Sequence, residues 1–124
     1  MKLAIVGSRL YNDYGFVRRK ILTYFNDDLS TIDEIVSGGA RGVDFLAERF
    51  ANAFDKPIKV FRADWKGLGK SAGHIRNKQI VDYSDIIFAF PGRSSPGTMN
   101  TVHQAAVAMY NGGKQILRVY EVDC

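Results

Sequence analysis

The sequence of 124 residues has little cysteine and no long apolar run, and both absences limit what the protein can be. Its single cysteine is the last residue, Cys124, so one chain can form neither an internal disulfide framework nor a cysteine-based metal site. No segment approaches the roughly 20 apolar residues that a transmembrane helix needs. The apolar run at residues 3–6 is too short for the hydrophobic part of a signal peptide. We therefore predict a cytoplasmic protein with no membrane partner and no metal.

The overall composition is that of a folded protein with a modest positive charge. Hydrophobic residues make up 46% of the chain and charged residues 24%, a balance typical of globular domains. The length corresponds to one ordinary domain, so residues 1–124 are predicted to form a single domain. Lys and Arg outnumber Asp and Glu by 17 to 13, a net charge of +4. This surplus suits an anionic partner such as phosphate, nucleotide or nucleic acid, without requiring one.

Short apolar segments and amphipathic segments alternate along the chain, separated by glycine-containing turns. The apolar segments predict strands, and the segments with apolar residues three and four apart predict helices. The expected strands are residues 3–6, 35–36, 58–61, 86–90 and 116–120, and the expected helices are residues 16–25, 43–54, 72–83 and 102–109. This alternation favours a parallel sheet with right-handed crossovers. We predict an α/β fold: a doubly wound, Rossmann-like domain whose five-stranded parallel sheet has the order 3-2-1-4-5, with helices on both faces.

Function is expected where the strands end. In such sheets ligands bind beyond the carboxyl ends of the strands, at the point where strand order reverses, here between the first and fourth strands. Nine of the 12 glycines and six of the 17 basic residues fall in the loops after the first four strands, at residues 7–9, 37–44, 62–73 and 91–98. Glycine backbone N–H groups, helix N-termini and arginines all favour anions. The sequence therefore predicts an anionic ligand at this edge.

Two familiar nucleotide-binding motifs are excluded. Gly69-Lys70-Ser71 looks like the end of a Walker A loop, but Asp64 occupies the position of its first glycine. No G-x-G-x-x-G follows the first strand, where Gly7 precedes Ser8. A P-loop nucleoside triphosphatase and a dinucleotide-binding fingerprint are thus disfavoured, and no cofactor is predicted.

Several segments together resemble a known family. They are AIVGSR at 4–9, SGGARGVD at 37–44, DW at 64–65, GKSAG at 69–73, RN at 76–77 and PG…GT at 91–98. In this order they are similar to the YspA/YpsA-like branch of the SLOG superfamily. The resemblance implies a Rossmann-like fold that binds nucleotides or nucleotide-derived ligands at these loops. Relatives in the superfamily include cytokinin-activating phosphoribohydrolases, the DNA-processing protein DprA and sensor domains of defence systems.

The resemblance, taken with the loop positions, gives a set of candidate ligand-binding residues. They are Gly7, Ser8, Arg9, Ser37, Gly38, Gly39, Ala40, Arg41, Gly42, Asp44, Asp64, Trp65, Arg76, Asn77, Pro91, Gly92, Gly97 and Thr98. Trp65 could stack on a base or cover an edge of the core. The phosphoribohydrolase motif P-G-G-x-G-T-x-x-E is incomplete, because Thr101 stands in place of its glutamate. Asp44 and Asp64 remain as candidate catalytic acids, and both also suit helix caps or arginine partners.

Three functions follow as hypotheses. The leading one is binding of a nucleotide or nucleotide-derived phosphorylated ligand, as a sensor, carrier or sequestering protein. The alternatives are an N-glycosidic hydrolase acting on a nucleotide and a DprA-like binder of single-stranded nucleic acid. A homodimer or higher homo-oligomer is a further expectation, based on Tyr11, Tyr14, Tyr110 and Tyr120 as candidate interface residues.

Overall fold

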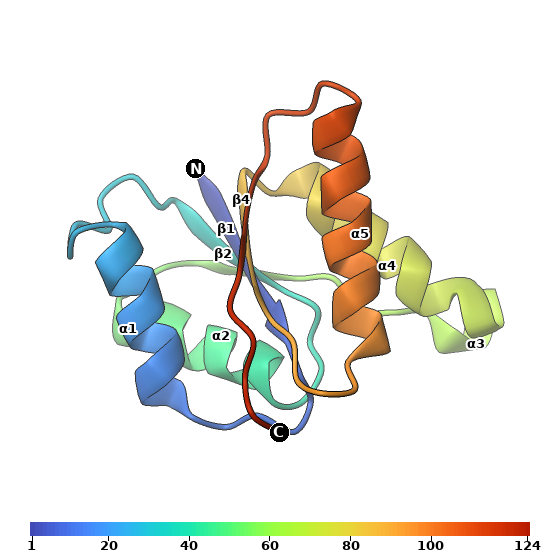
Figure 1. The fold of residues 1–124 in the computed structure, drawn as a ribbon, viewed down its shortest axis with the longest axis horizontal. Helices are drawn as coiled ribbons and strands as arrows, with labels where there is room; N and C mark the ends of the chain where they lie inside the picture. Colours follow the sequence, from blue (N-terminus) through green and yellow to red (C-terminus); the bar gives the residue numbers. More distant parts are fainter.

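A computed structural model describes all 124 residues, which form a parallel sheet flanked by helices (Figure 1). In chain order the elements are β1 (Lys2–Gly7), α1 (Tyr14–Tyr24), β2 (Glu34–Ser37), α2 (Val43–Ala53), β3 (Ile58–Val60), α3 (Trp65–Leu68), a 3-10 turn (Gly69–Ser71), α4 (Ala72–Tyr83), β4 (Ile86–Phe90), α5 (Pro96–Tyr110) and β5 (Ile116–Val119).

The sheet has the predicted topology. Its order is β3-β2-β1-β4-β5 and every neighbouring pair is parallel, which confirms the doubly wound α/β fold. Strand β1 lies at the centre, with Leu3 paired to Ile35 of β2 on one side and to Ile86 of β4 on the other. From β1 the sheet grows through β2 and β3 towards one edge, and β4 and β5 are then added on the other side of β1. The strand order therefore reverses between β1 and β4, and their carboxyl ends border the point where a ligand is expected.

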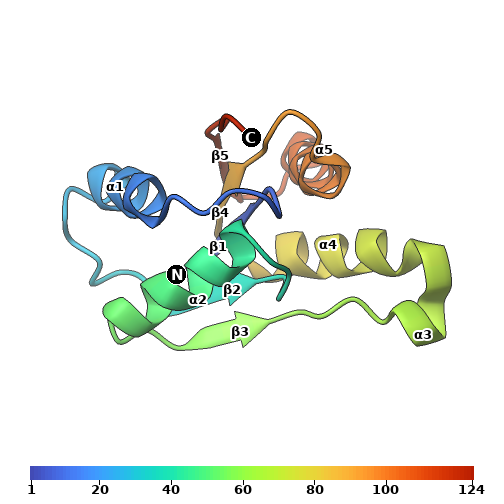
Figure 2. The ribbon, with the colours of Figure 1, turned by 90° about the horizontal axis from the view of Figure 1, so that it is seen from below.

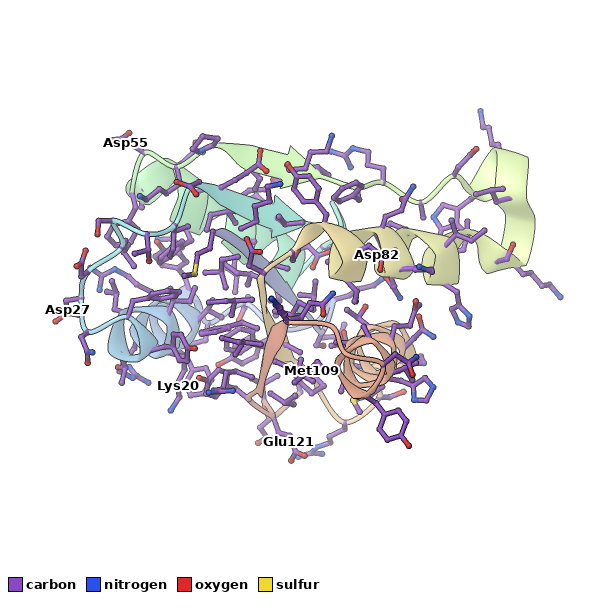
Figure 3. The ribbon with its side chains drawn as sticks, turned by 90° about the horizontal axis from the view of Figure 1, so that it is seen from above. Lys20, Asp27, Asp55, Asp82, Met109 and Glu121 are labelled. Carbon is purple, nitrogen blue, oxygen red and sulfur yellow. The ribbon has the colours of Figure 1, made fainter.

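Helices cover both faces of the sheet, and each face has its own core. Figure 2 shows α1 and α2 on one side and α4 and α5 on the other; in Figure 3, Lys20 of α1 and Asp82 of α4 lie on opposite sides. Successive side chains of β1 alternate between the two cores, as the two-residue period of a strand requires. Leu3 joins a core rich in large residues beneath α1 and α2, whereas Ala4 joins a core of smaller residues beneath α4 and α5.

Three details differ from the sequence prediction. Helix α5 begins at Pro96, inside the expected 91–98 loop, because Ser95 occupies the N-cap position and proline suits the first helical position. A short helix and a 3-10 turn occupy residues 65–71, which were expected to form a loop. On α4, Ile75 is 40% exposed while the polar Asn77 is buried, the reverse of what the polarity of the two residues favours. Asn77 is buried because it joins α4 to α5, as described below.

The tyrosines considered for an interface between copies are mostly part of the fold. Tyr11, Tyr14 and Tyr120 pack against the core beneath α1 and α2, and only Tyr110 is strongly exposed, at 91%. Each helix is too short or too polar to cross a membrane.

Candidate functional site

Two adjoining cavities open at the carboxyl edge of the sheet. The larger, of about 530 Å³, lies beyond β1 and β4 and is bordered by the N-terminal ends of α4 and α5. The smaller, of about 330 Å³, is lined by the loops after β2 and β3. Both have walls made by Arg9, Gly38, Ala40, Arg41, Trp65 and Arg76. The edge predicted from strand order is therefore hollowed, with room for a small molecule.

The fold brings together most of the candidate residues. The larger cavity is lined by Gly7, Ser8, Arg9, Gly38, Ala40, Arg41, Asp44, Trp65, Arg76, Asn77, Gly97 and Thr98. Gly39 lines only the smaller cavity. The remaining candidates lie outside both linings: Ser37, Gly42, Asp64, Pro91 and Gly92. Ser37 and Gly42 instead shape the loop that carries the others.

The sequence reasoning missed part of the lining. Further residues of the larger cavity include Leu10, Lys70, Gly73, His74, Ser94, Ser95, Pro96 and Thr101, and the smaller cavity adds Arg62 and Ala63. The residues around the start of α5 could have been found from the sequence, since Ser95 followed by Pro96 is a typical helix start. Reading it would have placed the start of α5, rather than a loop, at the site.

Gly42 locks the loop after β2 onto the loop after β1. Its φ is +69°, and a Cβ at this position would overlap the carbonyl oxygen of Ser8 and lie 2.5 Å from the carbonyl carbon of Arg9. The N–H of Val43, the next residue, donates to the same Ser8 oxygen at 3.1 Å. Only glycine allows this approach, and the resulting contact fixes the start of α2 beside the loop that carries Arg9.

Asp44 braces the loop from within and titrates near neutrality. It is 5% exposed, and its Oδ2 accepts a hydrogen bond from the N–H of Ala40 at 3.1 Å. The Ser37 hydroxyl donates to the Asp44 carbonyl at 3.3 Å and accepts from the Gly39 N–H at 3.1 Å. Burial raises the pKa of Asp44 to about 6, against the lowering effects of the Ala40 N–H and of nearby arginines. Asp44 is thus a structural brace with a carboxyl poised for proton exchange.

Arg76 is the best-fixed cation of the site. Its Nη1 donates to the carbonyl oxygens of Gly38, at 2.5 Å, and Phe61, at 3.4 Å, and its Nε donates to Asn77 Oδ1 at 2.9 Å. Partial burial lowers its pKa, and the carboxylate of Asp44 acts in the opposite direction. Nη2 donates to no group of the chain and remains available in a side chain that lines both cavities. The guanidinium is therefore held in place with one donor nitrogen free.

The N-terminus of α5 is fixed in the wall of the larger cavity. The Asn77 Nδ2 donates to the carbonyl of Gly97 at 3.1 Å and to Asn100 Oδ1 at 3.0 Å, which ties α4 to the first turn of α5. No side chain caps this 15-residue helix, and the N–H groups of Gly97 and Thr98 donate to no other group of the chain. Such free N–H groups, together with the helix dipole, favour an anion.

The arginines of the cavity walls take part in no ion pair. They stand at positions 9, 41, 62 and 76, and the three ion pairs of the chain involve other residues. Arg9 and Arg41 are exposed at the rim, where their long side chains can reach a bound group. Asp44 is the only acidic residue in either lining. Unpaired guanidinium groups of this kind suit phosphate, which they bind through paired hydrogen bonds.

The segment after β3 contributes an aromatic wall. Asp64 caps α3, its Oδ1 accepting from the N–H of Gly67 at 2.9 Å, so this carboxylate has a structural role. Trp65 is 55% exposed and lines both cavities. Its ring lies against Gly73 of α4, where a Cβ would come within 3.2 Å of Cη2. Trp65 therefore presents an accessible ring face at the seam between the cavities, close to the arginines.

Comparison with known proteins places the chain in a family. No solved structure matches it. The Gene 61 protein of Mycobacterium phage D29 is 34% identical over 116 residues, an alignment that covers 86% of this chain and 90% of the phage protein. A model of the YspA, cpYpsA-related SLOG family matches residues 1–67, which include β1, β2, the loops that carry Arg9 and Arg41, and α2 with Asp44. Membership supports a nucleotide-related function in general terms. The resemblance predicted from the motifs is thereby confirmed, and the chain belongs to the YspA, cpYpsA-related SLOG family.

Proposed function

We propose that the protein binds a nucleotide or nucleotide-derived phosphorylated ligand in the cavity at the carboxyl edge of the sheet, as a sensor, carrier or sequestering protein. The observation that carries the proposal is Arg76, whose guanidinium is held by two carbonyls and an amide while its Nη2 stays free beside the cavity. A cation fixed before binding loses little side-chain freedom when it meets an anion, which favours affinity.

The other walls supply complementary contacts. A phosphate at the N-terminus of α5 would accept from the N–H groups of Gly97 and Thr98, while Arg9 and Arg41 close over it from the rim. The ring of Trp65 offers a stacking surface for a base. Each contact is of a kind that nucleotide-binding sites use, and together they match the nucleotide-related function that the family supports.

The binding proposal is tested by calorimetric titration with adenosine and guanosine 5′-phosphates. Arg9→Ala and Arg41→Ala should each lower affinity at least tenfold, because a charge-assisted contact contributes roughly 1.5–3 kcal/mol. Their unfolding midpoints should stay unchanged, since both side chains are exposed. Arg18→Ala, an exposed arginine of α1 outside both cavities, is the matched control for charge. Unchanged affinity in both rim variants would contradict the proposal.

One observation favours a second candidate, hydrolysis of an N-glycosidic bond. Asp44 lines the larger cavity with a pKa of about 6, which suits a general acid or base near neutral pH. Incubation with a panel of nucleotides, followed by chromatography for free base, separates this activity from binding alone. Release of base by the wild type but not by Asp44→Asn supports hydrolysis, whereas binding without release leaves the first proposal.

A further inference from the structure

The two cavities share one wall, but each also has anion-attracting groups of its own, which we call its pole. The larger has the free N–H groups of α5 and the ammonium group of Lys70, and the smaller has the guanidinium group of Arg62. Arg76 belongs to both, and its position at the seam is fixed by its bonds to Gly38 and Phe61. A ligand that filled only one cavity would leave one of these poles without an anion.

The position of Arg62 sets the distance between the poles. Its Nη1 donates to the carbonyl of Gly39 at 3.2 Å, so the guanidinium folds back from the end of β3 to the end of β2. The N-terminus of α5 follows β4, and β4 is separated from β2 by the one strand β1, that is by two strand spacings or roughly 10 Å. This is the scale of one nucleoside unit between phosphates on its two ends, and Trp65 lies at the seam between them.

We propose that the ligand is a nucleotide phosphorylated at two separate positions of its ribose, with one phosphate in each cavity and the nucleoside at the seam beside Trp65. The inference rests on the proposed function and adds the class of ligand. Arg62 is then the residue that selects for the second phosphate, while the α5 N-terminus and the rim arginines hold the first. A ligand whose phosphates are contiguous places both charges in one cavity and gains nothing from Arg62.

The test compares three probes in calorimetric titrations: adenosine 5′-monophosphate, adenosine 5′-diphosphate and adenosine 3′,5′-bisphosphate, with the guanosine series in parallel. The wild type should bind the 3′,5′-bisphosphate at least tenfold more tightly than the monophosphate. Arg62→Gln should abolish that gain and change monophosphate affinity less than twofold. The 5′-diphosphate carries as many phosphates as the bisphosphate, and its affinity should not depend on Arg62.

Lys59→Gln is the matched control, since Lys59 is an exposed cation on β3 that lines neither cavity. Thermal unfolding of each variant checks that the fold is retained, as expected for exposed side chains. The inference is overturned if monophosphate binds and the 3′,5′-bisphosphate binds no more tightly. It is also overturned if Arg62→Gln weakens the diphosphate and the bisphosphate equally, because the gain would then reflect charge alone. Absence of binding by every probe would instead contradict the proposed function, and this inference with it.

Discussion

The loop at residues 38–44, whose last two residues begin α2, and the segment at residues 65–71 both contribute walls to the candidate site, but the chain holds them very differently. The first is anchored by the buried Asp44, by the Ser37 hydroxyl and by close contact with the loop after β1. The second contains no buried residue, and Figure 2 shows α3 beyond the end of α4, away from the sheet. Local stability follows buried contacts. The site therefore combines a rigid wall, which can fix an anion, with a weakly anchored wall, which can adjust to the rest of the ligand.

The sharpest test of this contrast uses two glycines with similar backbone. Gly42 has a φ of +69° and Gly69 a φ of +60°, conformations that a Cβ strains at both positions. A Cβ at Gly42 would also overlap the backbone of the Ser8 loop, whereas at Gly69 nothing lies within 4 Å. We expect Gly42→Ala to cost about 4 kcal/mol of unfolding free energy, as strain and overpacking add.

Gly69→Ala is the matched control, and its expected cost is at most about 2 kcal/mol because only strain acts and the surrounding segment can relax. Urea denaturation of the two variants measures the difference. Equal losses would show that the loop at residues 38–44 is no more tightly held than the segment at residues 65–71, and the comparison would fail.

The next largest effect on the unfolding free energy is expected from Asp44, the carboxyl group buried in the rigid wall. The folded protein holds the Asp44 proton more tightly than the unfolded chain does, with a pKa of about 6 against the usual 3.8. This group therefore favours folding at low pH, and its contribution is lost as the pH rises from about 4 through about 6. Asp44→Asn keeps an acceptor for the Ala40 N–H and carries no charge. Between pH 4 and pH 8, the variant should gain on the order of 3 kcal/mol in unfolding free energy relative to the wild type.

Denaturation measured at several pH values checks this, with Asp64→Asn as the control. Asp64 is an exposed helix cap on the weakly anchored wall, so its replacement should produce no comparable pH-dependent gain. If the difference in unfolding free energy between the wild type and Asp44→Asn stays constant over this pH range, the carboxyl of Asp44 is solvated or neutralised in the folded protein.

The contrast between the two walls also explains what sequence reasoning could reach. Strand order follows from the alternation of strands and helices, and the structure has the predicted order. A cavity also opens at the edge where the sequence predicts the site. The loop at residues 38–44 was recognisable because close backbone approach requires glycine, as at Gly42. The burial of Asn77 was not predictable from a helical pattern, because it depends on Gly97 and Asn100, which belong to another helix. The inward fold of Arg62 likewise depends on a carbonyl 23 residues away.

The smallest expected effect on stability concerns the weakly anchored wall, where a substitution should lower nucleotide affinity but hardly change the unfolding free energy. Trp65 is half exposed and contributes little to the core, so Trp65→Ala should change the unfolding free energy by less than about 1 kcal/mol. Loss of a stacked ring should nevertheless weaken nucleotide binding about tenfold, since stacking on an aromatic residue contributes roughly 1–3 kcal/mol per base. Trp65→Phe should keep part of the affinity. Leu68→Ala removes another exposed apolar side chain from the same segment, one that lines neither cavity, and should leave binding unchanged. If Leu68→Ala weakens binding as much as Trp65→Ala, the segment acts through its conformation rather than through its ring, and the adjustable wall would be a positioning element instead of a contact surface.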